Sequence, residues 1–374
     1  MMRIGIDCRI WGIKHAGLGR YTEQLVRNLQ IIDRENEYVL FCRAKDIDEI
    51  PTTQNFRKVL ADIAHYTFAE QLKLPQIFTQ EKLDLLHAPH FNVPILYKGK
   101  FVVTIHDVLW HDVKGLNVTT LSAPKYAFKY IAYRGVVRST VHRSRKIIAP
   151  TETVKNDLVE KFNVSSNKVI VTYEGATARI MKKYKTSSIL DKYGVKQPYL
   201  LYVGNLYPHK NLIQVVRALK TMDSPPMLVI ASGRNIFWHR FQKLLKDINA
   251  QDLVKMVGYV PDDELGALYN SAQAYTFPSL SEGFGLPGLE AMAYGTPVLA
   301  SDISVFKEVY KDAVLYFDPQ DTKDIADKIK ELAGDEELRS RLISKGKRRV
   351  KQFSWNKMAK ETLNVYKSVI NKTS

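Results

Sequence analysis

Short apolar runs and longer amphipathic segments alternate along the whole chain. The run Leu200-Leu201-Tyr202-Val203 is apolar at every position, which is typical of a strand buried on both faces of a parallel sheet. Helical spacing fills the intervals, for example at 212–220 and 238–248. This alternation predicts an α/β fold with doubly wound sheets. The expected strands span residues 3–8, 38–42, 83–87, 101–106, 146–149, 168–172, 199–203, 227–231, 254–257, 274–277, 297–300 and 314–317.

The alternation is interrupted at residues 174–198, where polar residues and Gly194 precede a new apolar strand. A chain of 374 residues is long enough for two domains at roughly 100–200 residues each. We therefore interpret the interruption as the connection between two Rossmann-like halves. The predicted domains are an N-terminal domain at 1–175 and a C-terminal domain at 176–354. A final helix is predicted at 355–374, with Ser354 as its candidate N-cap.

Composition excludes several classes of protein. Hydrophobic residues make up 45% of the chain and charged residues 25%, which is typical of a globular protein and not of a disordered or fibrous one. No apolar run reaches the ~18–20 residues that a membrane span needs, and the first residues resemble a strand more than a signal peptide. Cys8 and Cys42 lie in apolar runs and are expected to be buried, reduced thiols. We therefore expect a cytoplasmic protein.

The net charge of +16 is compatible with nucleic acid, anionic lipid or phosphorylated substrates as partners. Residues 113–151 carry eight Lys and Arg residues and no acidic one, with aromatic residues interleaved. We expect peripheral contact with an anionic membrane through the region from Lys125 to Lys146, and no nucleic-acid partner. The alternative is a solvated basic face on a partly buried helix. The basic residues are Lys114, Lys125, Lys129, Arg134, Arg138, Arg143, Arg145 and Lys146.

The strongest candidate for chemistry is the segment from Glu282 to Glu290, which follows the strand at 274–277. Gly283 and Gly285 allow a backbone to approach a ligand closely, and the helix start at Pro287 offers free N–H groups to a phosphate. The two glutamates can accept hydrogen bonds from the hydroxyl groups of a sugar or ribose, with Glu290 expected in the first turn of the helix. The alternative is a glycine turn with a glutamate at a favourable helix position.

Three weaker candidates also follow predicted strands. Lys210 lies before a helix that Asn211 could cap, where it could pair with a diphosphate or simply be solvated. His106 ends the strand at 101–106, so it faces the edge where doubly wound sheets bind ligands, or it is a structural histidine. Gly17 and Gly19 form half of a dinucleotide-binding pattern in a loop before a helix, or a plain tight turn. The pair Asp46 and Asp48 is interpreted as a solvated loop, and no zinc spacing occurs.

Together these segments resemble the retaining glycosyltransferases of family 4, also called group 1. The resemblance is carried by the two glutamates at 282 and 290, with the continuation through Gly295, Pro297 and Val298. The opening at 4–9, followed by 17–21, resembles the bacterial polysaccharide mannosyltransferases of this family. The family implies a GT-B fold, in which two Rossmann-like domains face a cleft and the C-terminal helix crosses back to the N-terminal domain.

The resemblance also implies roles for particular residues. It implies that Glu290 binds the ribose, that Lys210 binds the diphosphate and that His106 contacts the donor sugar. Glu282 would bind the transferred sugar together with the backbone that follows it, and the loop at 17–19 would close over the phosphates and acceptor. The expected catalytic residues are His106, Lys210 and Glu282. The expected donor-binding residues are Gly17, Gly19, Asn205, Lys210, Glu282, Gly283, Phe284, Gly285, Leu286 and Glu290.

One position departs from the family pattern. Many relatives carry arginine after the glycine that corresponds to Gly204, whereas this chain has Asn205. Asparagine donates hydrogen bonds but carries no charge. We therefore expect neutralisation of the diphosphate to depend more on Lys210 and on the N–H groups of a helix start.

The expected function is transfer of a sugar from a nucleotide sugar to a saccharide or lipid-linked acceptor, with GDP-mannose as the first choice of donor. No cofactor and no obligatory metal are expected, because a nucleoside diphosphate is already a good leaving group. The alternatives are a UDP-glucose or UDP-N-acetylglucosamine donor, or a sugar-nucleotide-binding protein without turnover. The intact segment from Glu282 to Glu290 argues against an epimerase or a phosphorylase.

Overall fold

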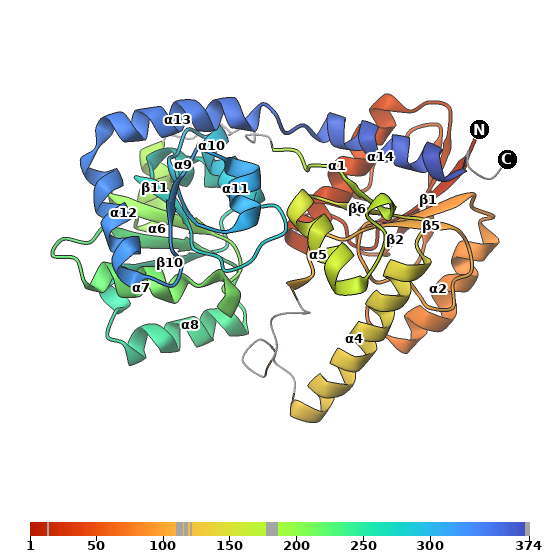
Figure 1. Ribbon diagram of the computed structural model, residues 1–374, viewed down its shortest axis with the longest axis horizontal. Coiled ribbons are helices and arrows are strands. Elements are labelled where there is room, and N and C mark those ends of the chain that lie inside the picture. Colours follow the sequence, from red (N-terminus) through yellow and green to blue (C-terminus); the bar gives the residue numbers. More distant parts are fainter. Residues whose placement is uncertain (13–14, 110–114, 116–118, 120–121, 177–185, 371–374) are drawn as a thin grey trace. The chain divides into compact units, whose positions relative to one another are not determined.

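The computed structural model describes residues 1–12, 15–109, 115, 119, 122–176 and 186–370. The chain divides into two compact units (Figure 1). The first unit contains Met1–Val108, Leu121–Gly175 and Ser354–Ser374, and the second contains Leu109–Thr120 and Ala176–Phe353. Residues 109–120 thus group with the second unit, whereas the predicted boundary at 175 assigned them to the first. A hydrogen bond explains this for Thr119, whose carbonyl accepts from Arg240 of the second unit at 3.0 Å.

The first unit is built on a parallel sheet with the strand order β3-β2-β1-β4-β5-β6-β7 over the described residues. The order reverses between β1 and β4, as in doubly wound folds. The strands are β1 (Arg3–Asp7), β2 (Glu37–Cys42), β3 (Phe56–Leu60), β4 (Leu85–Ala88), β5 (Phe101–Thr104), β6 (Lys146–Ala149) and β7 (Val169–Val171). The helices are α1 (Ala16–Ile32), α2 (Phe68–Gln80), α4 (Ala123–Arg143), α5 (Glu152–Phe162), the short η3 (Ser166–Lys168) and α14 (Trp355–Ile370).

The second unit repeats this plan with the parallel strand order β10-β9-β8-β11-β12-β13 over the described residues. Its order reverses between β8 and β11. The strands are β8 (Tyr199–Val203), β9 (Met227–Ala231), β10 (Val254–Gly258), β11 (Ala274–Phe277), β12 (Val298–Ser301) and β13 (Leu315–Phe317). The helices are α6 (Thr186–Tyr193), η4 (Pro208–Lys210), α7 (Leu212–Lys220), α8 (Ile236–Asp247), η5 (Gln251–Leu253), α9 (Asp262–Ser271), α10 (Leu286–Ala293), α11 (Ser304–Tyr310), α12 (Thr322–Gly334) and α13 (Glu336–Val350).

The predicted α/β class with two doubly wound parallel sheets is confirmed. The prediction missed β3, which is one of the two edge strands of the first sheet over the described residues. An edge strand is only partly covered, so Arg57 and Lys58 interrupt its apolar run and hide the strand from a search for continuous hydrophobicity. Among the described residues, none of the helices combines the length and hydropathy that a membrane span requires. Cys8 and Cys42 are free and buried.

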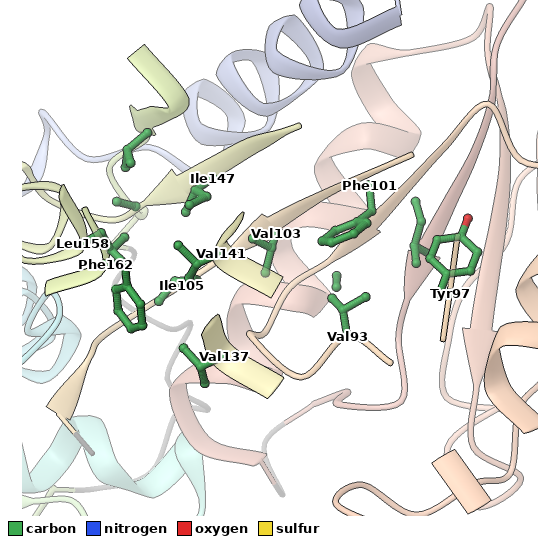
Figure 2. Close-up of a cluster of buried hydrophobic side chains, with 14 of the residues drawn as sticks. Val93, Tyr97, Phe101, Val103, Ile105, Val137, Val141, Ile147, Leu158 and Phe162 are labelled. Atoms are coloured by element: carbon green, nitrogen blue, oxygen red, sulfur yellow. The ribbon is translucent and has the colours of Figure 1, made fainter. Parts of the chain in front are cut away.

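One cluster of buried side chains in the first unit joins the strands β2, β4, β5 and β6 to the helices α2, α4 and α5 (Figure 2). Phe101 and Val103 of β5, Val141 of α4 and Leu158 of α5 belong to this cluster, and all of them are at most 1% exposed. Burial of each such side chain stabilises the fold by roughly 1.5–3 kcal/mol. This packing fixes the end of β5, from which His106 follows two residues later.

The last helix, α14, belongs to the first unit and packs against α1 (Figure 1). Met358 and Tyr366 are fully buried on its inner face. The hydroxyl of Tyr366 lies 2.5 Å from Nδ1 of His87 in β4. A chain segment separated from β4 by the whole second unit therefore completes the first core.

Candidate active site

In the second unit, Lys210 and Glu282 lie together at the carboxyl edge of the sheet. Lys210 ends η4, which follows β8, and Glu282 lies in the loop after β11. Their Nζ and Oε1 atoms are 2.5 Å apart, and the two side chains retain 18% and 13% exposure. The hydroxyl of Ser279 donates to the same Glu282 oxygen at 2.7 Å. Two residues predicted separately thus form one partly buried ion pair.

The loop around η4 is held by its neighbours. The N–H of Leu280 donates to the carbonyl of His209 at 2.9 Å, which joins the two loops that carry Lys210 and Glu282. Burial, and then the charge of Lys210, lower the pKa of His209 to about 3, so that imidazole is neutral near pH 7. His209 thus adds no positive charge where these two loops meet, and the ion pair there is formed by Lys210 and Glu282.

The sequence suggested that the side chain of Asn211 caps α7, but in the structure it makes no hydrogen bond to the start of this helix. Asn211 occupies the N-cap position with a φ of 58°, and its amide nitrogen donates to the carbonyl of Pro319 at 2.8 Å. The left-handed backbone turns the side chain away from the helix N–H groups. Asn205 lies exposed in the loop after β8, where its carbonyl accepts from the hydroxyl of Tyr202 at 2.7 Å.

The glycine loop after β11 is shaped by packing. Gly285 has a φ of 95° and caps α10, which begins at Leu286. The hydroxyl of Tyr310 donates to the carbonyl of Gly285 at 2.5 Å, and a Cβ on Gly285 or on Gly288 would overlap this hydroxyl. Phe284 is 4% exposed and packs edge-on against Phe353, with ring centroids 5.4 Å apart. The Phe284 side chain is therefore a structural anchor.

Glu290 lies in the second turn of α10 and not in the first, because Gly285 ends the loop and the helix starts at Leu286. It is 9% exposed, which is rare for a glutamate. The residues from Gly283 to Glu290 therefore form one compact turn and helix start next to the ion pair at Glu282.

In the first unit, His106 is the candidate residue with the most side-chain and backbone partners around its ring. Its Nδ1 lies 2.9 Å from Oε1 of Glu174, and its Nε2 lies 3.2 Å from the carbonyl oxygen of Pro89. The ring of Tyr21 packs edge-on against it, with centroids 4.7 Å apart at 82°. Glu174 is a partner of His106 that the sequence pattern did not predict. The available signal was an acidic residue three positions after a short apolar strand, at the same sheet edge as His106.

Gly17 and Gly19 were predicted in a loop, but they lie in the first turn of α1. A Cβ on Gly19 would overlap the carbonyl oxygen of Gly12, whereas nothing lies within 4 Å of a Cβ on Gly17. The carbonyl of Gly19 also accepts from the N–H of Gly12 at 3.2 Å. The close approach of the Gly12 backbone thus requires a glycine at position 19, whereas position 17 has room for a side chain.

Comparison with known proteins places these two units. Residues 15–178 match the family described as "Glycosyltransferase Family 4", and residues 187–349 match "Glycosyl transferases group 1". The chain is 27% identical to the O-antigen chain mannosyltransferase B of Escherichia coli over 94% of this chain and 96% of the relative. It is 29% identical to the O-antigen chain mannosyltransferase RfbU of Salmonella typhimurium over 73% of this chain and 71% of the relative.

Solved structures share the fold. Sucrose-phosphate synthase from Thermosynechococcus elongatus matches with a TM-score of 0.76 at 18% identity, covering 100% of both chains. HepE from Anabaena, in complex with UDP and glucose, matches with a TM-score of 0.76 at 16% identity over 98% of this chain and 100% of HepE. These likenesses confirm the predicted GT-B class. The two matched domains span both units, and the chain therefore belongs to the family 4, group 1 glycosyltransferases.

Proposed function

We propose that this glycosyltransferase moves mannose from GDP-mannose to a saccharide or lipid-linked acceptor in polysaccharide biosynthesis, with retention of configuration. The observation that carries the proposal is the 27% identity with an O-antigen chain mannosyltransferase over almost the full length of both chains. RfbU, a second relative at 29% identity, has the same kind of name. Retention follows from the family resemblance drawn on the segment from Glu282 to Glu290.

The second unit supplies the groups that such a donor requires. Lys210 is a cation at the end of η4, and α10, whose N-terminus carries the positive end of the helix dipole, begins at Leu286. A diphosphate that binds Lys210 would take over the ammonium, which now contacts Glu282 at 2.5 Å. The released oxygen of Glu282 could then accept from a sugar hydroxyl, beside the backbone of Gly283, Phe284 and Gly285. Glu290 would accept from the ribose hydroxyls.

The transfer step needs positive groups that are already in place. Breakage of the anomeric C–O bond develops negative charge on the leaving diphosphate and positive charge on the sugar. Once the bound diphosphate has taken over the Lys210 ammonium from Glu282, this cation and the N-terminus of α10 would stabilise the developing negative charge. We infer that no resident metal and no cofactor take part, and that the diphosphate oxygen receives the acceptor's proton.

Helix α4 supports peripheral contact with an anionic membrane, where a lipid-linked acceptor resides. Its buried residues all lie in the last two turns, so its first half projects from the first unit (Figure 1). Phe128 and Ile131 share one face and are 62% and 71% exposed. Basic residues flank this apolar pair, which suits insertion between anionic headgroups. These flanking residues are Lys125, Lys129, Arg134 and Arg138; Lys114 lies outside the described residues.

A UDP sugar is the second candidate donor. HepE, which has the same fold, is described in complex with UDP and glucose and with UDP-glucose. HepE is only 16% identical to this chain, so the likeness concerns the fold and not the donor. The exposed Asn205, in place of the usual arginine, is compatible with both nucleotides because it contributes no charge.

The donor is tested by thermal unfolding with GDP, UDP or ADP in excess. A nucleotide at 100 times its dissociation constant adds about 2.7 kcal/mol of stability, which raises the melting temperature measurably. We expect stabilisation by GDP alone, followed by transfer from GDP-mannose. Glu290→Ala should abolish the shift, whereas the surface variant Glu331→Ala on α12 should keep it. Stabilisation by UDP alone would show that the donor is a UDP sugar and not GDP-mannose. No shift with GDP, UDP or ADP would argue against a nucleotide site at Lys210 and Glu290.

A further inference from the structure

The ring of His106 has an oxygen acceptor at each nitrogen. Oε1 of Glu174 lies 2.9 Å from Nδ1, and the carbonyl oxygen of Pro89 lies 3.2 Å from Nε2. The side chains of His106 and Glu174 retain only 12% and 6% exposure. Water therefore competes little for these contacts, and the protein itself determines how the ring is oriented.

The two contacts decide where the hydrogens of the ring lie. A carbonyl oxygen only accepts, so the contact with Pro89 requires a hydrogen on Nε2. The contact with Glu174 requires one further proton, which lies either on Nδ1 or on the carboxyl group. If the proton lies on Nδ1, the ring is an imidazolium with a hydrogen on both nitrogens. If it lies on the carboxyl group, Nδ1 accepts a hydrogen bond from that group and the hydrogen of the neutral ring stays on Nε2. His106 therefore presents a donor at Nε2.

Tyr21 restrains the ring from a third side. Its ring packs edge-on against His106, and its hydroxyl lies 3.0 Å from Oγ1 of Thr104 at the end of β5. The same Oγ1 lies 2.8 Å from Nε2 of His87. Tyr21 is 1% exposed, so it cannot turn aside without opening the core. The remaining freedom of His106 is rotation of its ring, which the contact with Glu174 removes.

Glu174 is itself held in place. It follows β7 and is 4% exposed. The next residue, Gly175, lies so close to Trp355 that a Cβ on it would overlap the Trp355 backbone nitrogen. The backbone that carries Glu174 is therefore wedged between the end of β7 and the start of α14, and its carboxyl group is positioned before any ligand arrives.

We propose that Glu174 is a positioning residue, and that it fixes His106 so that Nε2–H is the donor offered to an oxygen of the nucleotide sugar. This inference rests on the proposed function, in which His106 contacts the donor. While no ligand is bound, the carbonyl of Pro89 accepts from Nε2–H, and an oxygen of the nucleotide sugar would share or take over this hydrogen bond. Exchange of one oxygen acceptor for another costs little, because the hydrogen bond is replaced and not lost.

The proposal is tested with Glu174→Leu and Glu174→Gln. Leucine leaves Nδ1 without a partner, whereas the amide of glutamine donates to Nδ1 and keeps the hydrogen on Nε2. We expect Glu174→Leu to lower kcat/KM about 10- to 100-fold, and Glu174→Gln to stay within about threefold of the wild type. In a His106→Ala background, Glu174→Leu should cost less than about twofold more, because it acts through the missing ring.

Three results would overturn the positioning role. They are a Glu174→Leu variant that retains kcat/KM within about threefold, an equal loss in both variants, or a full additional loss in the His106→Ala background. The equal loss would assign the effect to carboxylate charge, and the additional loss to packing. Melting temperatures establish that each variant is folded.

A second measurement needs neither turnover nor variants. The imidazole ¹⁵N–¹H spectrum of wild-type His106 should show a hydrogen on Nε2, and a bare Nε2 would overturn the proposal. If the folded wild type transfers no sugar from any donor, the proposed function fails, while this spectrum still decides the state of the ring. The failure of one proposal is therefore distinguishable from the failure of the other.

Discussion

Lys210 and Glu282 are 72 residues apart in the chain, yet their Nζ and Oε1 atoms lie 2.5 Å apart at the carboxyl edge of the second sheet. Each group neutralises the other while no ligand is bound. When the donor binds, its diphosphate would take the place of Glu282 beside Lys210, and a sugar hydroxyl would take the place of Lys210 beside Glu282. The pair therefore keeps two charged side chains in position without leaving either one unpaired in a partly buried place.

This arrangement predicts that Lys210→Ala lowers kcat on the order of 10²-fold, the scale of losing one preorganised donor. The measurement is steady-state transfer from GDP-mannose. Lys323→Ala is the matched control, because Lys323 pairs with Asp327 on an exposed face of α12. Near-normal turnover in Lys210→Ala would move stabilisation of the diphosphate to another group.

The two glycines of α1 should respond differently to alanine. Gly19→Ala places a Cβ against the carbonyl oxygen of Gly12, and we expect it to destabilise the fold by about 1–3 kcal/mol. Gly17→Ala meets no atom within 4 Å, and alanine favours helix, so stability should be kept or slightly raised. Chemical denaturation of both variants tests this. A loss of activity in a stable Gly17→Ala variant would then report on ligand binding at this turn.

The apolar and the basic residues of α4 should contribute differently to membrane binding. Replacement of Phe128 and Ile131 by Ser should weaken binding to all vesicles, since these two side chains supply the exposed apolar surface. Neutralisation of Lys125, Lys129, Arg134 and Arg138 should weaken binding to anionic vesicles only, by about 1 kcal/mol for each charge. Vesicle sedimentation measures both effects. Unchanged binding in both variants would show that α4 is a solvated face.

The stability of the first unit should fall in mild acid because of His87. Burial lowers its pKa to about 3 from the ordinary value of 6.5, so the folded chain binds fewer protons than the unfolded chain between these values. Stability is therefore fully present above pH 6.5 and is lost progressively as the pH falls towards 3. The loss for this one group reaches at most about 1.4 kcal/mol per pH unit.

The variant His87→Gln separates this contribution from other acid effects. It removes the hydrogen bonds to Tyr366 and Thr104, so it should be less stable than the wild type at pH 7. Its melting temperature should nevertheless fall less steeply between pH 6.5 and 4.5. Parallel slopes in the two proteins would contradict the assignment to His87.

Sequence pattern predicted the fold class well because buried parallel strands have a strong signature. It failed where neighbours in space decide the outcome. The strand β3 was missed because an edge position tolerates Arg57 and Lys58. Glu174 was missed because its partner, His106, lies 68 residues away in the chain. The side chain of Asn211 was misassigned because a left-handed backbone and the carbonyl of Pro319 redirect it.

The return of α14 to the first unit has a consequence for the order of folding during synthesis. Residues 176–353 form the body of the second unit and emerge before α14 does. At roughly 5–20 residues per second, the ribosome needs on the order of ten seconds or more to make them. During that time the surface of α1 that α14 covers is exposed to water and to other nascent chains. Most of the first unit is thus translated before the body of the second unit, but its fold is completed only after it.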